Sequence, residues 1–410
     1  MSRDFRLFWT GQTISRFGSV FTAVVLPIIA IRHLGATATD VAVIVAAGTA
    51  SVLAFGLLAG VWADRVPRRR PYLIACDLVA AATLGVVTVA LATGHLAVWV
   101  LAGFAFTFGL IGVFIEALYF AHLRSIVGAD AVTRARARLQ GGEYVGSVLG
   151  RVVAGPVVVV GGMVVPLLVD MASYLVNAAC LVFIRKPEPP VPGRRGRIDR
   201  AELVAGFAAL RDEPFLRRLM PFVAVDSFAG GMVSAVQAVF LLTVLAIPTA
   251  WYGSLFVLIG VAGAVGTIIS DRLVNRFDGR HMAIGGFLGG VAATALLPLA
   301  SGPLPVAAVV AALGIGLPAL FGAISNVGLT GFVTTAVSEE VLGRTSVSMQ
   351  LITASTRIAG ALAGGLVADA LGARPTLWAA VILSLLVSLT LLPLARTMPE
   401  RLVPSGEMNP

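Results

Sequence analysis

The stretch GVWADRVPRRR, from Gly60 to Arg70, determines how the rest of the chain is organised. About twenty apolar residues precede it, charge is concentrated in its last seven positions, and another apolar run follows. A helix needs about 20 apolar residues to cross the hydrocarbon core of a bilayer. The stretch is therefore predicted to be a tight polar turn between two membrane spans.

The composition extends this conclusion to the whole chain. Of its 410 residues, 58% are hydrophobic and 12% are charged, and the mean hydropathy is +0.94. That is more apolar side chain than one soluble core could bury. Strand-type alternation is absent, which argues against a barrel. We therefore expect an all-α integral membrane protein with the lipid bilayer as its solvent.

Apolar stretches long enough to span a bilayer recur along the whole chain and predict twelve spans. Their expected limits are 9–31, 41–62, 71–91, 96–120, 142–160, 164–184, 219–245, 252–269, 282–300, 304–333, 347–370 and 375–394.

Positive charge gives the orientation of these spans. Of the 30 Lys and Arg residues, only Arg32 and Arg374 fall in the turns of one side, and Arg16, Arg151 and Arg357 lie within spans. Basic residues collect in cytoplasmic loops. Both termini are therefore expected in the cytoplasm. An N-terminal cleavage signal is not expected, because cleavage would remove the first of an even set of spans.

The two halves of the chain contain similar sequence features at a nearly constant spacing. Ser270-Asp271-Arg272 lies 207 residues after the corresponding part of the Gly60–Arg70 turn, and Arg357 lies 206 residues after Arg151. Two six-span repeats in parallel orientation are typical of one large class of transporters.

The turn itself resembles the signature loop of the major facilitator superfamily, with the spacing G-x-x-x-D-R-x-x-R-R. Pro67 stands where that family usually has glycine. The residues that match the loop are Gly60, Asp64, Arg65, Arg68 and Arg69. In that family Asp64 would cap the eleventh helix, which is expected to begin near Thr345.

The resemblance implies twelve helices in two pseudo-symmetric six-helix bundles, with a substrate cavity between them. The domains would be 1–184, an N-terminal bundle, and 219–396, a C-terminal bundle. A cytoplasmic linker with an amphipathic interfacial helix would occupy 185–218, and 397–410 would be a cytoplasmic tail.

Several functions are not expected. The only lysine, Lys186, follows Arg185, so no phosphate-binding loop of an ATPase can form. The four histidines lie far apart, and Cys76 and Cys180 are read as buried side chains. The basic residues are used in loops rather than in a nucleic-acid surface. We expect no enzyme, no metal and no cofactor.

Charged residues within spans are the candidates for function, because each costs about 2.5 to 3.5 kcal/mol to insert near the bilayer centre. The family fold suggests that Arg16, Arg151, Asp226 and Arg357 converge on the cavity. Glu116 and Glu143 lie near the cytoplasmic surface, where a structural role is favoured. Asp77 and Asp170 belong to spans that are peripheral in the family. Simple mutual neutralisation of the cluster remains an alternative.

Asp226 is the first choice for a proton site, because it lies about two turns inside a span that lines the family's cavity. Arg16 and Arg357 are its expected partners. The expected function is proton-coupled export of a small amphipathic compound. The stretches FRLFWTGQTISRFGSV, 5–20, and ELVAGF, 202–207, are similar to the bacterial branch that exports macrolides, other drugs and siderophores.

Gly155-Pro156 is similar to the motif of the family's antiporters. The expected location is a bacterial cytoplasmic membrane, and the expected state is a monomer. Two rivals stay open: an importer of a small, anionic solute, and a membrane sensor or assembly subunit that does not transport.

Overall fold

The computed structural model describes residues 2–66, 68–128, 131–186, 207–208, 210–336 and 339–391. Within these residues it contains helices and no strand. Twelve helical segments are long and apolar enough to cross a membrane, which confirms the expected fold class.

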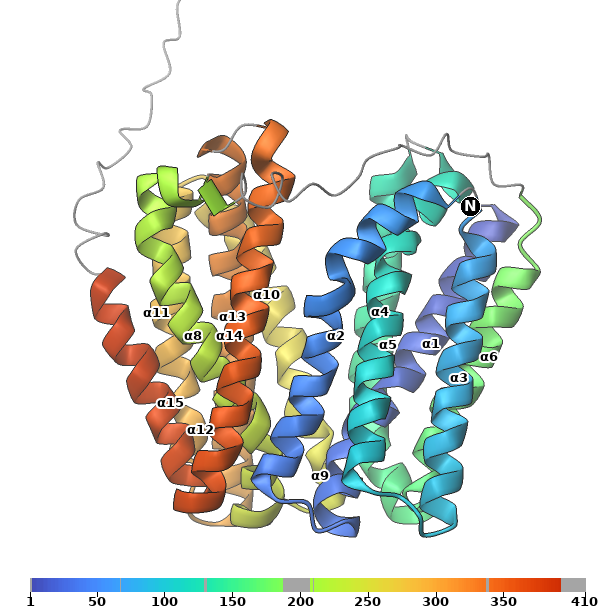
Figure 1. The fold of residues 1–410 in the computed structure, drawn as a ribbon, viewed down its shortest axis with the longest axis horizontal. Coiled ribbons are helices and arrows are strands. Elements are labelled where there is room, and N and C mark those ends of the chain that lie inside the picture. The colour runs from blue at the N-terminus through green and yellow to red at the C-terminus, as the bar shows by residue number, and fades with distance from the viewer. Residues whose placement is uncertain are drawn as a thin grey trace, which may run out of the picture.

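The spans form two bundles that lie side by side (Figure 1). The N-terminal half contains α1 (Arg3–Ile28) with η1 (Ile29–His33), α2 (Ala38–Arg65), α3 (Arg70–Ala92), α4 (Val98–Val127), α5 (Val132–Gly161) and α6 (Val164–Val182).

The C-terminal half begins with α8 (Pro214–Val239) and η3 (Phe240–Val244). It continues with α9 (Thr249–Tyr252), η4 (Ser254–Phe256), α10 (Val257–Leu273), α11 (Gly279–Thr294), α12 (Leu296–Leu299), α13 (Leu304–Ala336), α14 (Glu339–Leu371), α15 (Ala373–Ser388) and η5 (Leu389–Leu391).

The loops between the spans lie at two opposite ends of the molecule, an inner end and an outer end. The N-terminus and the α2–α3 loop lie at the inner end, which is at the top of Figure 1 and is predicted to face the cytoplasm. The α1–α2 and α3–α4 connections lie at the outer end. The two bundles diverge toward the inner end and converge at the outer end (Figure 1).

Matching π-helical turns close the first span of each half. Leu34 N–H donates to the carbonyl of Ile29 at 3.0 Å, and Leu245 N–H donates to that of Phe240 at 2.9 Å. Each turn leads into a left-handed residue, Gly35 with φ 63° and Ala246 with φ 51°. The equivalence extends the sequence repeat to the detail of the backbone.

Several helices extend further toward the inner end than their apolar runs. Helix α5 begins at Val132 rather than near 142, and α14 begins at Glu339 rather than near Thr345. Residues 214–218, which the sequence assigned to the linker, form the first turn of α8. Residues 207, 208 and 210–212 of the expected interfacial helix are also helical, whereas 202–206, 209 and the tail lie outside the described residues.

Glycine pairs allow close helix packing within each half. Gly146 and Gly150 lie against the backbone of α1, and Gly360 and Gly364 lie against that of α8. A Cβ at Gly146 would meet the Thr13 carbonyl at 3.1 Å, so a larger residue would push α5 away.

Candidate functional site

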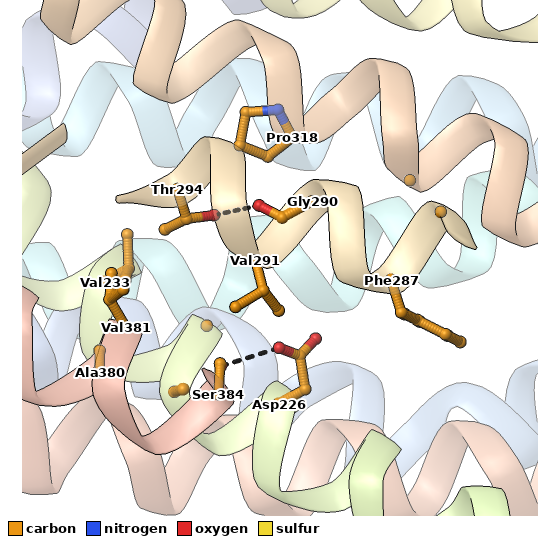
Figure 2. A pocket seen from close by; sticks show the side chains of 14 residues that line it. Asp226, Val233, Phe287, Gly290, Val291, Thr294, Pro318, Ala380, Val381 and Ser384 are labelled. Atoms are coloured by element: carbon orange, nitrogen blue, oxygen red, sulfur yellow. Dashed lines mark hydrogen bonds between the residues drawn. The ribbon is translucent and has the colours of Figure 1, made fainter. Parts of the chain in front are cut away.

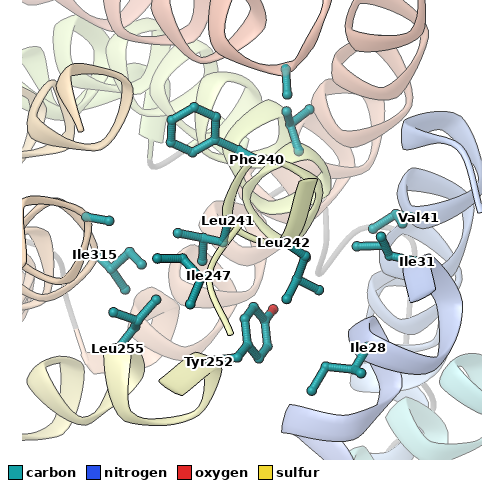
Figure 3. Packing of buried hydrophobic residues seen from close by; sticks show 14 of the residues in the cluster. Ile28, Ile31, Val41, Phe240, Leu241, Leu242, Ile247, Tyr252, Leu255 and Ile315 are labelled. Carbon is teal, nitrogen blue, oxygen red and sulfur yellow. The ribbon is translucent and has the colours of Figure 1, made fainter. Parts of the chain in front are cut away.

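The outer end is sealed by an apolar cluster built from both halves. Ile28, Ile31 and Val41 of the N-terminal half share it with Leu242 and Tyr252 of the C-terminal half (Figure 3). All five side chains are buried. We call this set the outer gate cluster. Its further members include Val20, Phe21, Ala154, Ala235 and Ala361.

Hydrogen bonds join the two halves beside this cluster. Asp369, near the end of α14, accepts the backbone N–H of Ala38 at 2.8 Å through Oδ1 and that of Thr39 at 3.0 Å through Oδ2. Arg32 donates to the carbonyl of Ile247 at 3.0 Å. A carboxylate at a helix N-terminus is favourable because it meets free N–H groups and the positive end of the helix dipole.

Glycines bring the backbones of the two halves together at the same end. Gly155 of α5 lies against the carbonyl of Ala250, and Gly253 lies against that of Arg151. A Cβ at Gly365 would lie 2.6 Å from the Cβ of Ala42. Gly155-Pro156, which the sequence compared with an antiporter motif, therefore lies at a contact between the halves.

An ion pair lies on the N-terminal half. Arg16 of α1 and Glu143 of α5 approach to 3.7 Å, and their side chains are 56% and 27% exposed. Tyr119 of α4 lies next to both charged groups. The pair thus combines one acid and one base, both partly exposed, on two helices that pack against each other.

Two other arginines hydrogen-bond to serine hydroxyls in the described part of the chain. Arg151 donates to Ser147 Oγ at 3.3 Å, and its Cζ lies 6.0 Å from the ring centre of Phe256 in the other half. Arg357 donates to Ser234 Oγ at 2.9 Å. Neither guanidinium lies within 4.0 Å of a carboxylate in the described part of the chain.

Asp226 lies inside the C-terminal half. It accepts a hydrogen bond from Ser384 Oγ of α15 at 2.9 Å and borders a cavity of about 250 Å³ (Figure 2). Helices α8, α11, α13 and α15 line the cavity, and Phe287, Val291 and Pro318 make most of its wall apolar.

The expected cluster of Arg16, Arg151, Asp226 and Arg357 is therefore not assembled in this structure. Each of the four has a different partner, and Asp226 bonds to a helix of its own bundle. The family fold and the depth of Asp226 in its span predicted a position near the arginines, whereas its position on the face of α8 directs it toward α15.

The remaining acids within spans also have partners of their own or are exposed. Asp170 accepts hydrogen bonds from Thr22 and Ser173, and Asp77 accepts one from Asn177 at 2.8 Å. The bonds from Thr22 and Asn177 join helices within the N-terminal half, and the bond from Ser173 lies within α6. Glu116 of α4 is exposed.

The signature loop is described only in part. Pro67 and the side chain of Asp64 lie outside the described residues. Arg65 and Arg68 are exposed, Arg69 is buried, and Gly60 has open space around it. The expected cap of α14 by Asp64 stays a prediction.

Sequence reasoning did not select Asp369. Its position two residues before the end of α14 gave it the appearance of an ordinary helix-end acid. The available signal was the capping sequence Thr37–Asp40, which marks a helix N-terminus at the same predicted side of the membrane.

Comparison with known proteins agrees with this architecture. The sequence profile described as Major Facilitator Superfamily matches residues 8–359. No curated protein sequence matches the chain.

Solved structures match over nearly the whole chain at low identity. The nucleoside transporter NupG (D323A mutant) has a TM-score of 0.79 at 12% identity, covering 95% of this chain and 99% of its own. A bacterial homologue of the iron transporter ferroportin, inward-facing, has 0.75 at 15%, covering 96% and 100%. A bacterial homologue of the human lysosomal transporter Spinster, inward-facing and unoccupied, has 0.71 at 14%, covering 97% and 98%.

Proposed function

The chain belongs to the major facilitator superfamily of membrane transporters, and we propose that it is a proton-coupled exporter of small amphipathic compounds that works by alternating access. The observation that carries the proposal is the asymmetry between its two ends. An apolar cluster, hydrogen bonds and glycine contacts join the halves at the outer end, whereas the bundles diverge toward the inner end (Figure 1). Rocking of one half against the other would open the outer end and close the inner end.

The contacts that would have to break are few and reversible. Three hydrogen bonds join Asp369 and Arg32 to the opposite half, and the remaining seal is apolar packing. A single hydrogen bond contributes about 0.5 to 1.5 kcal/mol. A seal of this kind is compatible with opening during a transport cycle.

Glu143 is the acid best placed to couple protons to transport. It is partly exposed and paired with Arg16, so protonation of its carboxylate would remove the negative charge and release the arginine. Asp226 bonds to Ser384 within one bundle and is the second candidate. The geometry thus favours a coupling residue different from the one first expected from the sequence.

Export rather than uptake rests on the resemblance of 5–20 and 202–207 to the efflux branch. A bacterial cytoplasmic membrane is the corresponding location. Uptake would instead raise the amount of compound in intact cells that carry the protein. A non-transporting sensor would show no substrate-dependent proton flux in vesicles.

Reconstituted vesicles test the coupling. Neutral and anionic fluorescent amphipaths serve as probes, and an internal pH dye reports protons. We expect a pH gradient to accelerate probe movement by the unaltered protein, and Glu143→Gln to abolish this dependence while probe exchange continues.

Two further variants give this experiment its controls. Glu116→Gln removes an exposed carboxylate from the neighbouring helix α4 and is expected to keep gradient-driven movement. If Glu143→Gln also keeps it and Asp226→Asn loses it, the coupling site is Asp226. Absence of proton flux with every probe that moves would contradict proton coupling altogether.

A further inference from the structure

Three membrane-embedded arginines each lie within about one helical turn of a residue of the outer gate cluster. Helices α1, α5 and α14 all run from the inner to the outer end, and on each the arginine precedes a member of the outer gate cluster by three or four residues. The pairs are Arg16 with Val20, Arg151 with Ala154, and Arg357 with Ala361. At a rise of 1.5 Å per residue, each Cα lies about 5 to 6 Å inward of its paired residue.

The positive charge of these arginines is only partly compensated. Arg16 extends toward Glu143, which lies eight residues before Arg151 on α5, about 12 Å further inward. Asp226 of α8 lies near the level of Arg357, because Gly231 of α8 packs against the carbonyl of Arg357, but Asp226 bonds to Ser384 of α15 instead. Arg151 and Arg357 therefore keep their charge next to the seal, with serine hydroxyls as their described partners.

Aromatic surface lies beside the Arg151 guanidinium and on the outer gate cluster. Phe256 lies beside Arg151, and Phe17 packs on the gate cluster and forms an edge contact with Phe21 at 5.1 Å. A guanidinium group binds carboxylates and sulfonates through paired N–H donors, and a neighbouring ring can pack against an apolar body. The two features together fit one kind of ligand.

We propose that Arg151 and Arg357 form the binding site for an amphipathic organic anion, with its charged group between the two guanidinium groups and its apolar body against the outer gate cluster. The inference deepens the proposed function, because it names the substrate class. It also gives export a driving force: a membrane potential that is negative inside contributes about 2.3 kcal/mol per charge per 100 mV toward moving an anion outward.

Binding can be measured without transport. The purified protein in nanodiscs of zwitterionic lipid is titrated with 8-anilinonaphthalene-1-sulfonate, an anionic amphipath, and with N-phenyl-1-naphthylamine, which has a similar aromatic skeleton and no charge. We expect Arg151→Gln and Arg357→Gln each to weaken binding of the sulfonate about tenfold, the effect of losing one charge-assisted hydrogen bond, and to leave binding of the amine unchanged.

Arg276→Gln is the matched control. Arg276 is exposed and follows the inner end of α10, outside the outer gate cluster. This variant should bind both probes as the unaltered protein does. Arg151→Lys and Arg357→Lys keep the charge and should recover most of the sulfonate binding, which a purely structural role of the arginines would not predict.

Three outcomes would overturn the inference. The first is equal binding of the sulfonate by the glutamine variants and the unaltered protein. The second is parallel loss of both probes, which would mean that the arginines only hold the fold. The third is displacement of the sulfonate by anionic lipid added to the nanodiscs, which would assign the arginines to a lipid headgroup. Failure of proton coupling in vesicles would leave this result untouched, so the two proposals can fail separately.

Discussion

Ala246 has a left-handed backbone conformation, and the equivalent residue in the first half is a glycine. Ala246 has φ 51°, and Gly35, 211 residues earlier, has φ 63°. A left-handed conformation costs an L-residue about 1 to 2 kcal/mol, whereas glycine adopts it freely and loses about 0.5 to 1 kcal/mol through backbone entropy. The two positions therefore differ in backbone strain.

This difference predicts opposite effects of two substitutions. Ala246→Gly should raise the free energy of unfolding by about 0.5 to 1 kcal/mol, and Gly35→Ala should lower it by a similar amount. No atom lies within 4 Å of a Cβ built at Gly35, so the second effect would come from the backbone alone. Thermal unfolding midpoints in detergent provide the measurement. A lower midpoint for Ala246→Gly would show that the strain argument is wrong.

The depth of a site residue along its helix was easier to predict from the sequence than the direction of its side chain. The rise of a helix gives the level of Arg16, Arg151 and Arg357 from residue numbers alone. The direction in which a side chain points depends on how each helix rotates against its neighbours. For this reason Asp226 was expected in the cavity and lies against Ser384 instead.

At the scale of elements, helices α2 and α14 meet at the boundary between the two halves. The outer end of α14 supplies Asp369 to the N-terminus of α2. The family resemblance predicts the reciprocal arrangement at the inner end, with Asp64 of α2 at the N-terminus of α14. The outer cap can form only when the outer end is closed, and the inner cap only when the inner end is closed. The two caps would therefore form in alternate conformations.

Asp369→Asn should favour opening of the outer end. An amide offers one acceptor oxygen where the carboxylate offers two, and the charge at the helix N-terminus is lost, together worth about 1 to 2 kcal/mol. Alkylation of a cysteine at Leu242, within the gate cluster, should become about 5 to 30 times faster with an impermeant reagent added from outside.

Asp40→Asn is the matched control for this measurement. Asp40 accepts hydrogen bonds from Thr37 at the same helix terminus but belongs to the same half. It should leave the alkylation rate near that of the unaltered protein. Equal rates in the Asp369 and Asp40 variants would show that the contact between the halves does not hold the outer end closed.

The spans themselves were well predicted because bilayer thickness sets the length of an apolar helix. The errors occur mainly at the inner end, where helices continue beyond the apolar segment. Helix α5 adds ten residues that include Arg134, Arg136 and Arg138, which are compatible with helix although they are polar. Hydropathy detects the membrane boundary, whereas backbone hydrogen bonds determine where a helix ends.

At the scale of the whole molecule, the charge pattern predicts one orientation in the membrane. Thr93 lies in the outer connection between α3 and α4, and Arg134 lies near the inner start of α5. In intact cells, a cysteine at Thr93 should react with an impermeant maleimide, and a cysteine at Arg134 should react only after the membrane is permeabilised. The reverse pattern would place both termini outside.

The π-helical turns at Ile29–His33 and Phe240–Val244 indicate a common origin of the two halves. A π turn arises when one extra residue is accommodated in an α-helix, and such turns are rare. Two of them at equivalent places, followed by the same change of backbone hand, indicate that the insertion preceded duplication of an ancestral six-helix unit. In that history, the ancestor already had this backbone irregularity, and the difference between Gly35 and Ala246 arose after the duplication.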